Sequence, residues 1–156
     1  MQALVSPSPH SQPRRSVIGW DSSRLAMILA VLEARCDIKF SGLDVYLNVA
    51  GGLKITETAA DLAVAASLIS ARENIIIPED FVFFGEVSLS GAIRSVGKIE
   101  NRLKEAEKLG FKKVESPTNT KLVKGLNIEV FENLDLLSFV NKLSNGIKKI
   151  KTENLN

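Results

Sequence analysis

The order of apolar and polar positions along the chain predicts alternating helices and strands. A first helix is predicted after the N-cap signal Asp21-Ser22-Ser23, because apolar side chains then recur at helical spacing: Leu25, Ile28, Leu29 and Leu32. A strand is predicted over "DVYLNVAGG" (44–52), where apolar and polar positions alternate before a glycine pair. A second helix follows this strand, from about Thr58 to Arg72.

The stretch "TETAADLAVAASLISA" (56–71) makes the second helix apolar on all sides beyond its first turn. A surface helix keeps a polar face, so this helix is expected to run through the middle of the domain. Its alanines are strong helix formers and let neighbouring elements approach closely. Thr58 and Asp61 are three residues apart and approximate a capping box, which predicts Thr58 as the N-cap.

The second half of the chain continues the alternation. "FVFFGEVSLSGAIRSVG" (81–97) predicts a β-hairpin, and "KIENRLKEAEKLGF" (98–111) predicts an amphipathic helix with Gly110 just past its end. Two short strands, a short helix and a last helix over "NLDLLSFVNKLS" (133–144) complete the pattern. Strands and helices that interleave in this way indicate an α/β or α+β fold in one domain.

Both ends of the chain lack this periodicity. Residues 1–15 contain three prolines and are predicted to be a linker, the truncated end of a preceding domain. The Asn- and Lys-rich residues 144–156 are predicted to be a flexible tail. The globular domain is therefore expected over residues 16–143.

The charge is unevenly distributed, although the whole chain carries a net charge of only +2. Residues 42–91 hold two basic and seven acidic side chains, whereas residues 92–124 hold nine basic and four acidic ones. A local excess of this kind is typical of a surface that binds a polyanion. A solvated protein surface is the simpler interpretation on charge alone.

Several kinds of chemistry have no support in the residues. With Cys36 and His10 as the only cysteine and histidine, no disulfide within the chain and no Cys/His zinc site is expected. The phosphate-binding pattern G-x-x-x-x-G-K-[ST] does not occur, since "GGLK" (51–54) has the wrong spacing. The apolar runs are too short to span a bilayer, so no membrane partner is expected. Together with the single cysteine and histidine, this favours a cytoplasmic protein without a metal. Cys36 is expected to pack as a small apolar side chain.

Four quoted stretches carry a resemblance to a known family: "RRSVIGWDSSRLAMILAVLEAR" (14–35), "DVYLNVAGGLKITETAADLAV" (44–64), "FGEVSLSGAIRSV" (84–96) and "EAEKLGFKKV" (105–114). With them the chain resembles the proteolytic domain of Lon-type peptidases. It is more similar to the C-terminal Lon-like domain of the RadA (Sms) family of bacterial recombination proteins. This resemblance implies the two-layer fold of domain 2 of ribosomal protein S5.

The resemblance also implies where a Ser-Lys dyad would stand. Lon peptidases carry the nucleophilic serine in a P-S-A-G run, and "GEVSLSG" (85–91) matches their following hairpin motif. In that register Ala59 occupies the serine position and Arg102 the lysine position. Alanine has no nucleophile, and arginine does not release a proton to act as a base. The dyad is therefore expected to be degenerate at Ala59 and Arg102, without peptidase activity.

A residual peptidase would need a substitute pair. Thr58 is one residue before the serine position, and Lys98 is one helical turn before Arg102. Thr58 is more simply interpreted as a helix cap and Lys98 as a basic surface residue, because a displaced pair rarely reaches hydrogen-bond distance. A residual Ser/Thr-Lys peptidase of the Lon type is therefore the less favoured alternative for this corner of the domain.

What the family does gives the basic segment a possible role. RadA-like proteins are implied to act as hexameric, ATP-driven branch-migration motors on DNA in the RecA recombinase pathway, in the nucleoid of the cytoplasm. ATP, magnesium and zinc would bind only in their other domains. The predicted DNA-contacting residues are the cations of the basic segment: Arg94, Lys98, Arg102, Lys104, Lys108, Lys112 and Lys113. The alternative is an assembly module that closes a homo-oligomeric ring without touching DNA.

Overall fold

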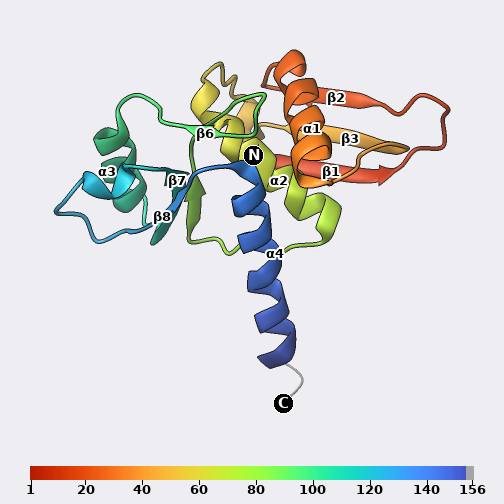
Figure 1. The fold of residues 1–156 in the computed structure, drawn as a ribbon. Coiled ribbons are helices and arrows are strands. Elements are labelled where there is room, and N and C mark those ends of the chain that lie inside the picture. The colour runs from red at the N-terminus through yellow and green to blue at the C-terminus, as the bar shows by residue number, and fades with distance from the viewer. Residues whose placement is uncertain (154–156) are drawn as a thin grey trace.

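The chain folds into a mixed α/β domain with four α-helices and three small sheets among residues 1–153 (Figure 1). The computed structural model describes these residues, and for Leu122 and residues 146–153 it describes the backbone alone. The elements in chain order are β1 (Gln2–Pro7), β2 (Arg15–Ile18), α1 (Ser22–Cys36), β3 (Leu43–Asn48), η1 (Ala50–Gly52), η2 (Thr58–Ala60), α2 (Asp61–Glu73), β4 (Phe81–Phe83), β5 (Glu86–Val87), β6 (Ile93–Arg94), α3 (Ile99–Lys108), β7 (Lys113–Pro117), η3 (Thr120–Leu122), β8 (Glu129–Asn133) and α4 (Leu136–Glu153).

The first sheet has the order β1-β3-β2, with β1 antiparallel and β2 parallel to β3. The predicted strand at residues 44–52 is confirmed as β3, whose alternating Val45 and Leu47 are buried. The prediction that residues 1–15 form a linker is wrong for most of its first half. Residues 2–7 pair with β3 along their whole length, because their apolar positions Ala3 and Val5 pack against the core.

Helix α2 runs through the centre of the domain, as its apolar pattern predicts. It contacts α1, β1, β4 and β5, and Figure 1 shows it between the first sheet and the rest of the molecule. Seven of its residues are buried, including Leu62, Leu68 and Ile69. Burial on several sides is what a helix without a polar face requires.

The second sheet consists of the parallel strands β4, β7 and β8, in the order β4-β7-β8. Helix α3 covers one face of it, and Leu103 and Ala106 of α3 form a second core with Val114 of β7. The predicted helix is thus confirmed, and Gly110 follows its C-cap with a φ of 92°. The hairpin prediction holds for β5 and β6, whereas residues 81–83 form β4 in the second sheet.

Helix α4 extends further than predicted. Its buried residues Leu136, Phe139 and Val140 pack on the first core, and its backbone stays helical to Glu153. In Figure 1 the C-terminal half of α4 points away from the body of the domain. Much of the predicted tail 144–156 is therefore helix, and residues 154–156 lie outside the described residues. Among the described residues, no helix combines the length and the apolar character that a membrane crossing needs.

Candidate functional site

The serine position of the Lon-like register lies at the start of the central helix. Ala59 is in η2, directly before α2, and is only 3% exposed. Its carbonyl oxygen accepts a hydrogen bond from the backbone N–H of Gly85 (2.8 Å), and Leu62 N–H donates to Gly85 O (3.1 Å). These two bonds fasten the start of α2 to the residue before β5. The methyl group of Ala59 offers no nucleophile at this position.

Asp61 is the buried charge of this corner. It is completely buried, and its carboxylate accepts hydrogen bonds from Arg24 Nε (2.9 Å) and from the backbone N–H of Val87 (3.0 Å). A second Arg24 nitrogen, Nη2, bonds to the other carboxylate oxygen. The single carboxylate therefore joins α1, α2 and β5.

The pKa values of both partners are shifted, for different reasons. Burial raises the pKa of the Asp61 carboxyl, and the hydrogen bonds from Arg24 and Val87 oppose that rise. The hydrogen bond to Asp61 raises the pKa of the Arg24 guanidinium. The bidentate contact favours the ionised form of the pair at neutral pH, because a guanidinium stays protonated and matches both carboxylate oxygens.

The predicted capping box at the start of α2 is wrong. Thr58 Oγ1 donates to Glu86 Oε2 (2.7 Å), and Ala60 occupies the N-cap position of α2 without a side-chain bond. A short 3-10 turn over residues 58–60 precedes α2 and moves its start to Asp61. Thr58 of this turn therefore binds Glu86 of the hairpin, and Asp61, the first residue of α2, binds Arg24 of α1.

The lysine position, Arg102, reaches the same corner from α3. The Arg102 guanidinium pairs with the carboxylate of Glu57, two residues before Ala59, with Nη1 at 3.2 Å from Oε2. Arg102 Nε also donates to the carbonyl oxygen of Gly97 (2.8 Å). Arg102 thus reaches the segment directly before the turn that contains Ala59, and its guanidinium is occupied by Glu57 and Gly97 O. Lys98 is exposed, and the hydrogen bonds of the described residues contain none between Lys98 and Thr58.

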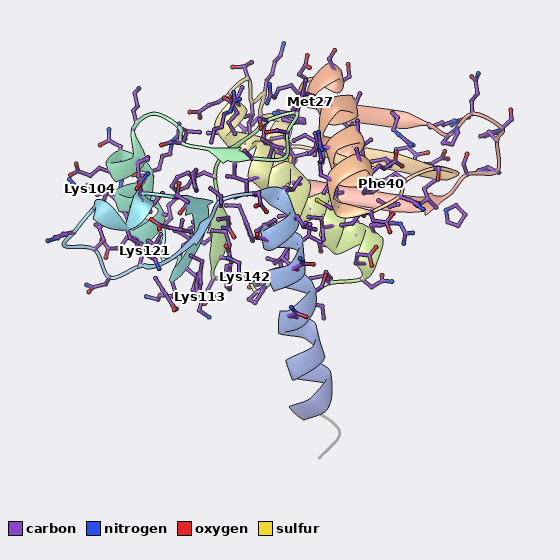
Figure 2. All side chains as sticks on the ribbon, in the orientation of Figure 1. Met27, Phe40, Lys104, Lys113, Lys121 and Lys142 are labelled. Atoms are coloured by element: carbon purple, nitrogen blue, oxygen red, sulfur yellow. The ribbon has the colours of Figure 1, made fainter. Side chains whose placement is uncertain are left out.

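The other predicted DNA-contacting residues come from several elements. Lys104 pairs with Glu100 at 2.5 Å and Lys108 with Glu105 at 3.6 Å, both along α3. Lys113 of β7 lies 3.7 Å from Asp80 and 5.1 Å from the centre of the Phe81 ring. Figure 2 shows Lys104 and Lys113 projecting from different parts of the domain.

Three predicted residues are exposed and belong to no ion pair among the described residues: Arg94, Lys98 and Lys112. Arg94 and Lys98 lie on either side of Gly97, whose carbonyl holds Arg102. Arg94, Lys98 and Arg102 are thus close to one another in the chain, before and within the first turn of α3. Lys112 directly precedes the central strand of the second sheet, and Lys113 is the first residue of that strand. Over the described residues, no group of three or more His, Cys, Asp or Glu side chains could hold a metal ion.

The pattern of the sequence missed two polar contacts of this site. Arg24 belongs to a helix whose other features predict only core packing, and Glu57 precedes the predicted cap. The available signal is Asp61 itself, because a carboxylate inside an otherwise apolar helix needs a buried partner. Its partner lies 37 residues away in the chain and follows only from the packing of α1 on α2.

Comparison with protein-family models identifies the class of domain to which the chain belongs. Residues 21–120 match the family model described as subunit ChlI of Mg-chelatase. This stretch begins at the N-cap of α1 and ends in η3, so it includes Ala59, Asp61 and Arg102. The match makes the chain a member of the class of domains that this model describes.

The individual relatives give the family within that class. The chain is similar to proteins named DNA repair protein RadA from Brucella abortus (53% identical over 145 residues), Rickettsia typhi (59% over 114 residues) and Chlamydia muridarum (41% over 151 residues). The matches cover 92%, 73% and 97% of the chain, respectively. The chain belongs to the RadA family. It spans 31%, 26% and 31% of the lengths of these three relatives.

Proposed function

We propose that the chain is a non-proteolytic, Lon-like domain that serves DNA repair within a RadA-type protein. The observation that carries the proposal is that the serine position is the buried Ala59 and that the lysine position, Arg102, is paired with Glu57. The name shared by the relatives supports the repair role. The finer fold assignment, to the two-layer fold of ribosomal protein S5 domain 2, belongs to the same proposal.

The absence of peptidase activity is tested with casein and a peptide library. The wild-type chain is expected to cleave neither, and Ala59→Ser is expected to remain inactive because Arg102 stays protonated. Thr58 is the remaining hydroxyl of the corner, and its hydrogen bond to Glu86 (2.7 Å) makes it the residue to test. Cleavage by the wild type that Thr58→Val abolishes would overturn this part of the proposal.

The domain contributes DNA binding through the cations around the start of α3. Arg94 and Lys98 are exposed there, and Lys104 and Lys108 lie four residues apart on the same helix. Contacts of lysine and arginine with phosphates are independent of base sequence and weaken as salt rises. Arg102 supports this surface by fixing the start of α3 to Glu57, so we assign it a positioning role next to its predicted DNA contact.

Fluorescence anisotropy of labelled duplex and single-stranded DNA, measured across a salt series, tests this contribution. The change Lys104→Glu/Lys108→Glu is expected to weaken binding at all sequences and to reduce the salt slope by about 1–2. Lys39→Glu is the matched control, because Lys39 is equally exposed and lies in the turn between α1 and β3. Unchanged affinity and slope in the double variant would contradict the assignment.

A role in assembly is the second candidate function. Large apolar side chains are exposed on the described surface, including Ile76 (86%), Leu89 (70%) and Leu134 (68%), and contact with another chain would remove them from water. In the full-length protein this role would be the scaffold of a homo-oligomeric ring, expected to be a hexamer. Light scattering separates the candidates: a monomer that binds DNA favours DNA contact, and a ring that ignores DNA favours assembly.

The remaining expectations concern the whole protein. For the full-length protein we propose an ATP-driven branch-migration activity, with ATP, magnesium and zinc bound outside this chain. We also propose a place in the RecA recombinase pathway within the nucleoid. They are tested with full-length protein, by ATP hydrolysis with and without this domain. Unchanged DNA stimulation of ATP hydrolysis after removal of the domain would argue against a role for it in DNA contact.

A further inference from the structure

A small pocket lies on the face of the second sheet that α3 does not cover. Val82, Val114 and Val130 belong to the core beneath α3, so the alternate residues of the three strands point to the opposite face. The pocket on that face has a volume of about 250 Å³ and lies between the sheet, α4 and residues 75–78. In Figure 1 the second sheet stands between α3 and α4.

Three phenylalanine side chains form one wall of this pocket. The rings of Phe81 and Phe83 in β4 stack with 6.1 Å between their centres, and the Phe131 ring of β8 stacks on Phe81 at 6.0 Å. All three residues are half-buried, so part of each ring is uncovered. Neighbouring aromatic rings with free surface favour a flat ligand that can stack on them.

Glu115 of β7 is the buried carboxylate of the pocket. It is 3% exposed and lies in register between Phe83 and Phe131 on the two neighbouring strands. Its Oε2 accepts hydrogen bonds from Asn133 Nδ2 (2.8 Å) and Lys142 Nζ (2.5 Å), whereas its Oε1 accepts none from the described residues. None of these residues has a buried side-chain oxygen without a partner, so Oε1 is accessible from the pocket that Glu115 lines.

Lys142 of α4 brings a hydrogen-bond donor to the same place. Its ammonium nitrogen lies 5.5 Å from the centre of the Phe131 ring, and Figure 2 shows Lys142 beside the second sheet. An ammonium group has three N–H bonds, and the Lys142 side chain is 38% exposed, so donors remain beyond the one given to Glu115. The pocket therefore presents an acceptor, Glu115 Oε1, next to a donor, Lys142 Nζ.

Charge and size restrict the ligand. The charges of Glu115 and Lys142 cancel, and a charged ligand would bring an unpaired charge against the apolar walls, which is unfavourable. A neutral ligand with a donor beside an acceptor satisfies both polar groups, as a carboxamide does. Pockets for drug-sized ligands measure roughly 300–1,000 Å³, so this smaller pocket suits a molecule with one ring.

We infer that this pocket binds a neutral, one-ring aromatic carboxamide. The amide N–H donates to Glu115 Oε1, the amide carbonyl accepts from Lys142 Nζ, and the ring stacks on the phenylalanine wall. The inference goes beyond the proposed function, since it involves neither the cations of α3 nor the positions of the Ser-Lys dyad. Binding at this pocket and binding of DNA are separate properties.

Three ligands of nearly the same shape test the recognition. Benzamide is the probe, acetophenone keeps the carbonyl but has no N–H, and benzoate is charged. NMR chemical-shift titrations of the isotope-labelled chain give both the affinity and the place of binding. Benzamide is expected to cause saturable shifts around residues 75–78 and Phe131, with a dissociation constant on the order of 1 mM. Acetophenone and benzoate should bind at least about tenfold more weakly, because a hydrogen bond to a charged group is lost.

A variant of the carboxylate makes the result specific. Glu115→Gln leaves the charge of Lys142 unbalanced, so benzoate is expected to bind this variant more tightly than benzamide does. General loosening of the pocket would weaken all ligands alike and would not reverse their order. Glu105→Gln is the matched control, because Glu105 also pairs with a lysine but lies on α3, and it should keep the wild-type order.

The wild-type titrations decide the inference by themselves if Glu115→Gln does not fold. Absence of saturable shifts at the pocket with benzamide would overturn it, as would binding of acetophenone or benzoate to the wild type as tightly as benzamide. An unchanged order of ligands in folded Glu115→Gln would do the same. Failure of the α3 variants to alter DNA affinity bears only on the proposed function.

Discussion

Arg24 of α1 donates to both carboxylate oxygens of Asp61, the completely buried first residue of α2. The third hydrogen bond to this carboxylate comes from Val87 N–H of β5 (3.0 Å). The pair thus ties the two helices of the first core to the hairpin, close to Ala59. A buried carboxylate left without its partner is strongly unfavourable, which makes this contact the strongest test of the fold.

Removal of the cation should cost more stability than removal of the negative charge. Arg24→Leu leaves Asp61 buried and unpaired, so we expect a loss of about 3 kcal/mol in the free energy of unfolding, measured by urea denaturation. Asp61→Asn keeps an oxygen for Val87 N–H, and Arg24, whose side chain is 27% exposed, can turn to solvent. Its loss should therefore be smaller. An equal or larger loss in Asp61→Asn would contradict this account.

The loss in Arg24→Leu should also depend on pH. Burial raises the pKa of Asp61 and Arg24 opposes the rise, so the variant has a still higher folded-state pKa at Asp61. A raised folded-state pKa means that folding takes up a proton, and stability then increases as pH falls. The deficit of Arg24→Leu relative to wild type should shrink between pH 8 and pH 5. A constant deficit would show that Asp61 does not titrate in this range.

Gly19 allows β2 to turn into α1 beneath the loop after β3. Its φ is 80°, and a Cβ at this position would lie 2.4 Å from Leu53 O and 2.8 Å from Val49 Cβ. Gly19→Ala is therefore expected to lower the free energy of unfolding by about 3 kcal/mol, from backbone strain and the clash together. Gly42→Ala is the control, since Gly42 has a φ of 71° and open space around its Cβ position. It should lose only about 1 kcal/mol.

The periodicity of the chain is sufficient to predict most helices and strands, and the reasons for the exceptions are physical. Helix α2 is predictable because residues that are apolar all round require burial on several sides. Strand β1 is not, because prolines and serines near it are typical of a linker, and its pairing partner β3 lies about 40 residues away. Pairing between distant segments depends on the tertiary fold.

The candidate site, like the fold, could be predicted from the sequence only in part. The positions of Ala59 and Arg102 follow from a resemblance along the chain, and Arg102 reaches the segment directly before the turn that contains Ala59. The partners of Arg102, Asp61 and Thr58 cannot be predicted from the sequence, because each partner is a polar side chain from another part of the fold. The predicted bond from Thr58 to the first turn of α2 loses to one with Glu86, since the hairpin packs directly on η2.

Cys36 is expected to react slowly in the folded protein. Burial raises the pKa of its thiol to about 11, and the negative charge of Asp135 adds to the rise. At pH 8 only about 0.1% of such a thiol is thiolate, the reactive form. Reaction with a disulfide reagent should therefore be much slower in the native protein than in urea. Asp135→Asn should speed it while keeping the helix cap that Asp135 forms with Ser138 N–H (2.8 Å).

The same thiol affects stability at high pH. Because its folded-state pKa is raised, its contribution is complete below the unfolded-state pKa of about 8.5 and is lost as pH rises toward 11. Cys36→Ser should therefore show less destabilisation than wild type between pH 8.5 and pH 11, apart from any constant difference. A native thiol that reacts as fast at pH 8 as in urea would contradict the shift.

Arg102 should differ from the lysines around it in what it does for the fold. It is 23% exposed, pairs with Glu57 and donates to Gly97 O, whereas Lys104 is 59% exposed and pairs only with Glu100. A double-mutant cycle of Arg102→Ala and Glu57→Gln is expected to give a coupling of about 1 kcal/mol, because a fixed bidentate pair exceeds a mobile one. The corresponding cycle of Lys104→Ala and Glu100→Gln should give almost no coupling.

DNA affinity measured with the same variants then separates the two roles of these residues. Lys104→Ala should reduce affinity without changing stability, and Arg102→Ala should reduce both. If Arg102→Ala left stability unchanged, the ion pair would not be what holds α3 to the start of α2.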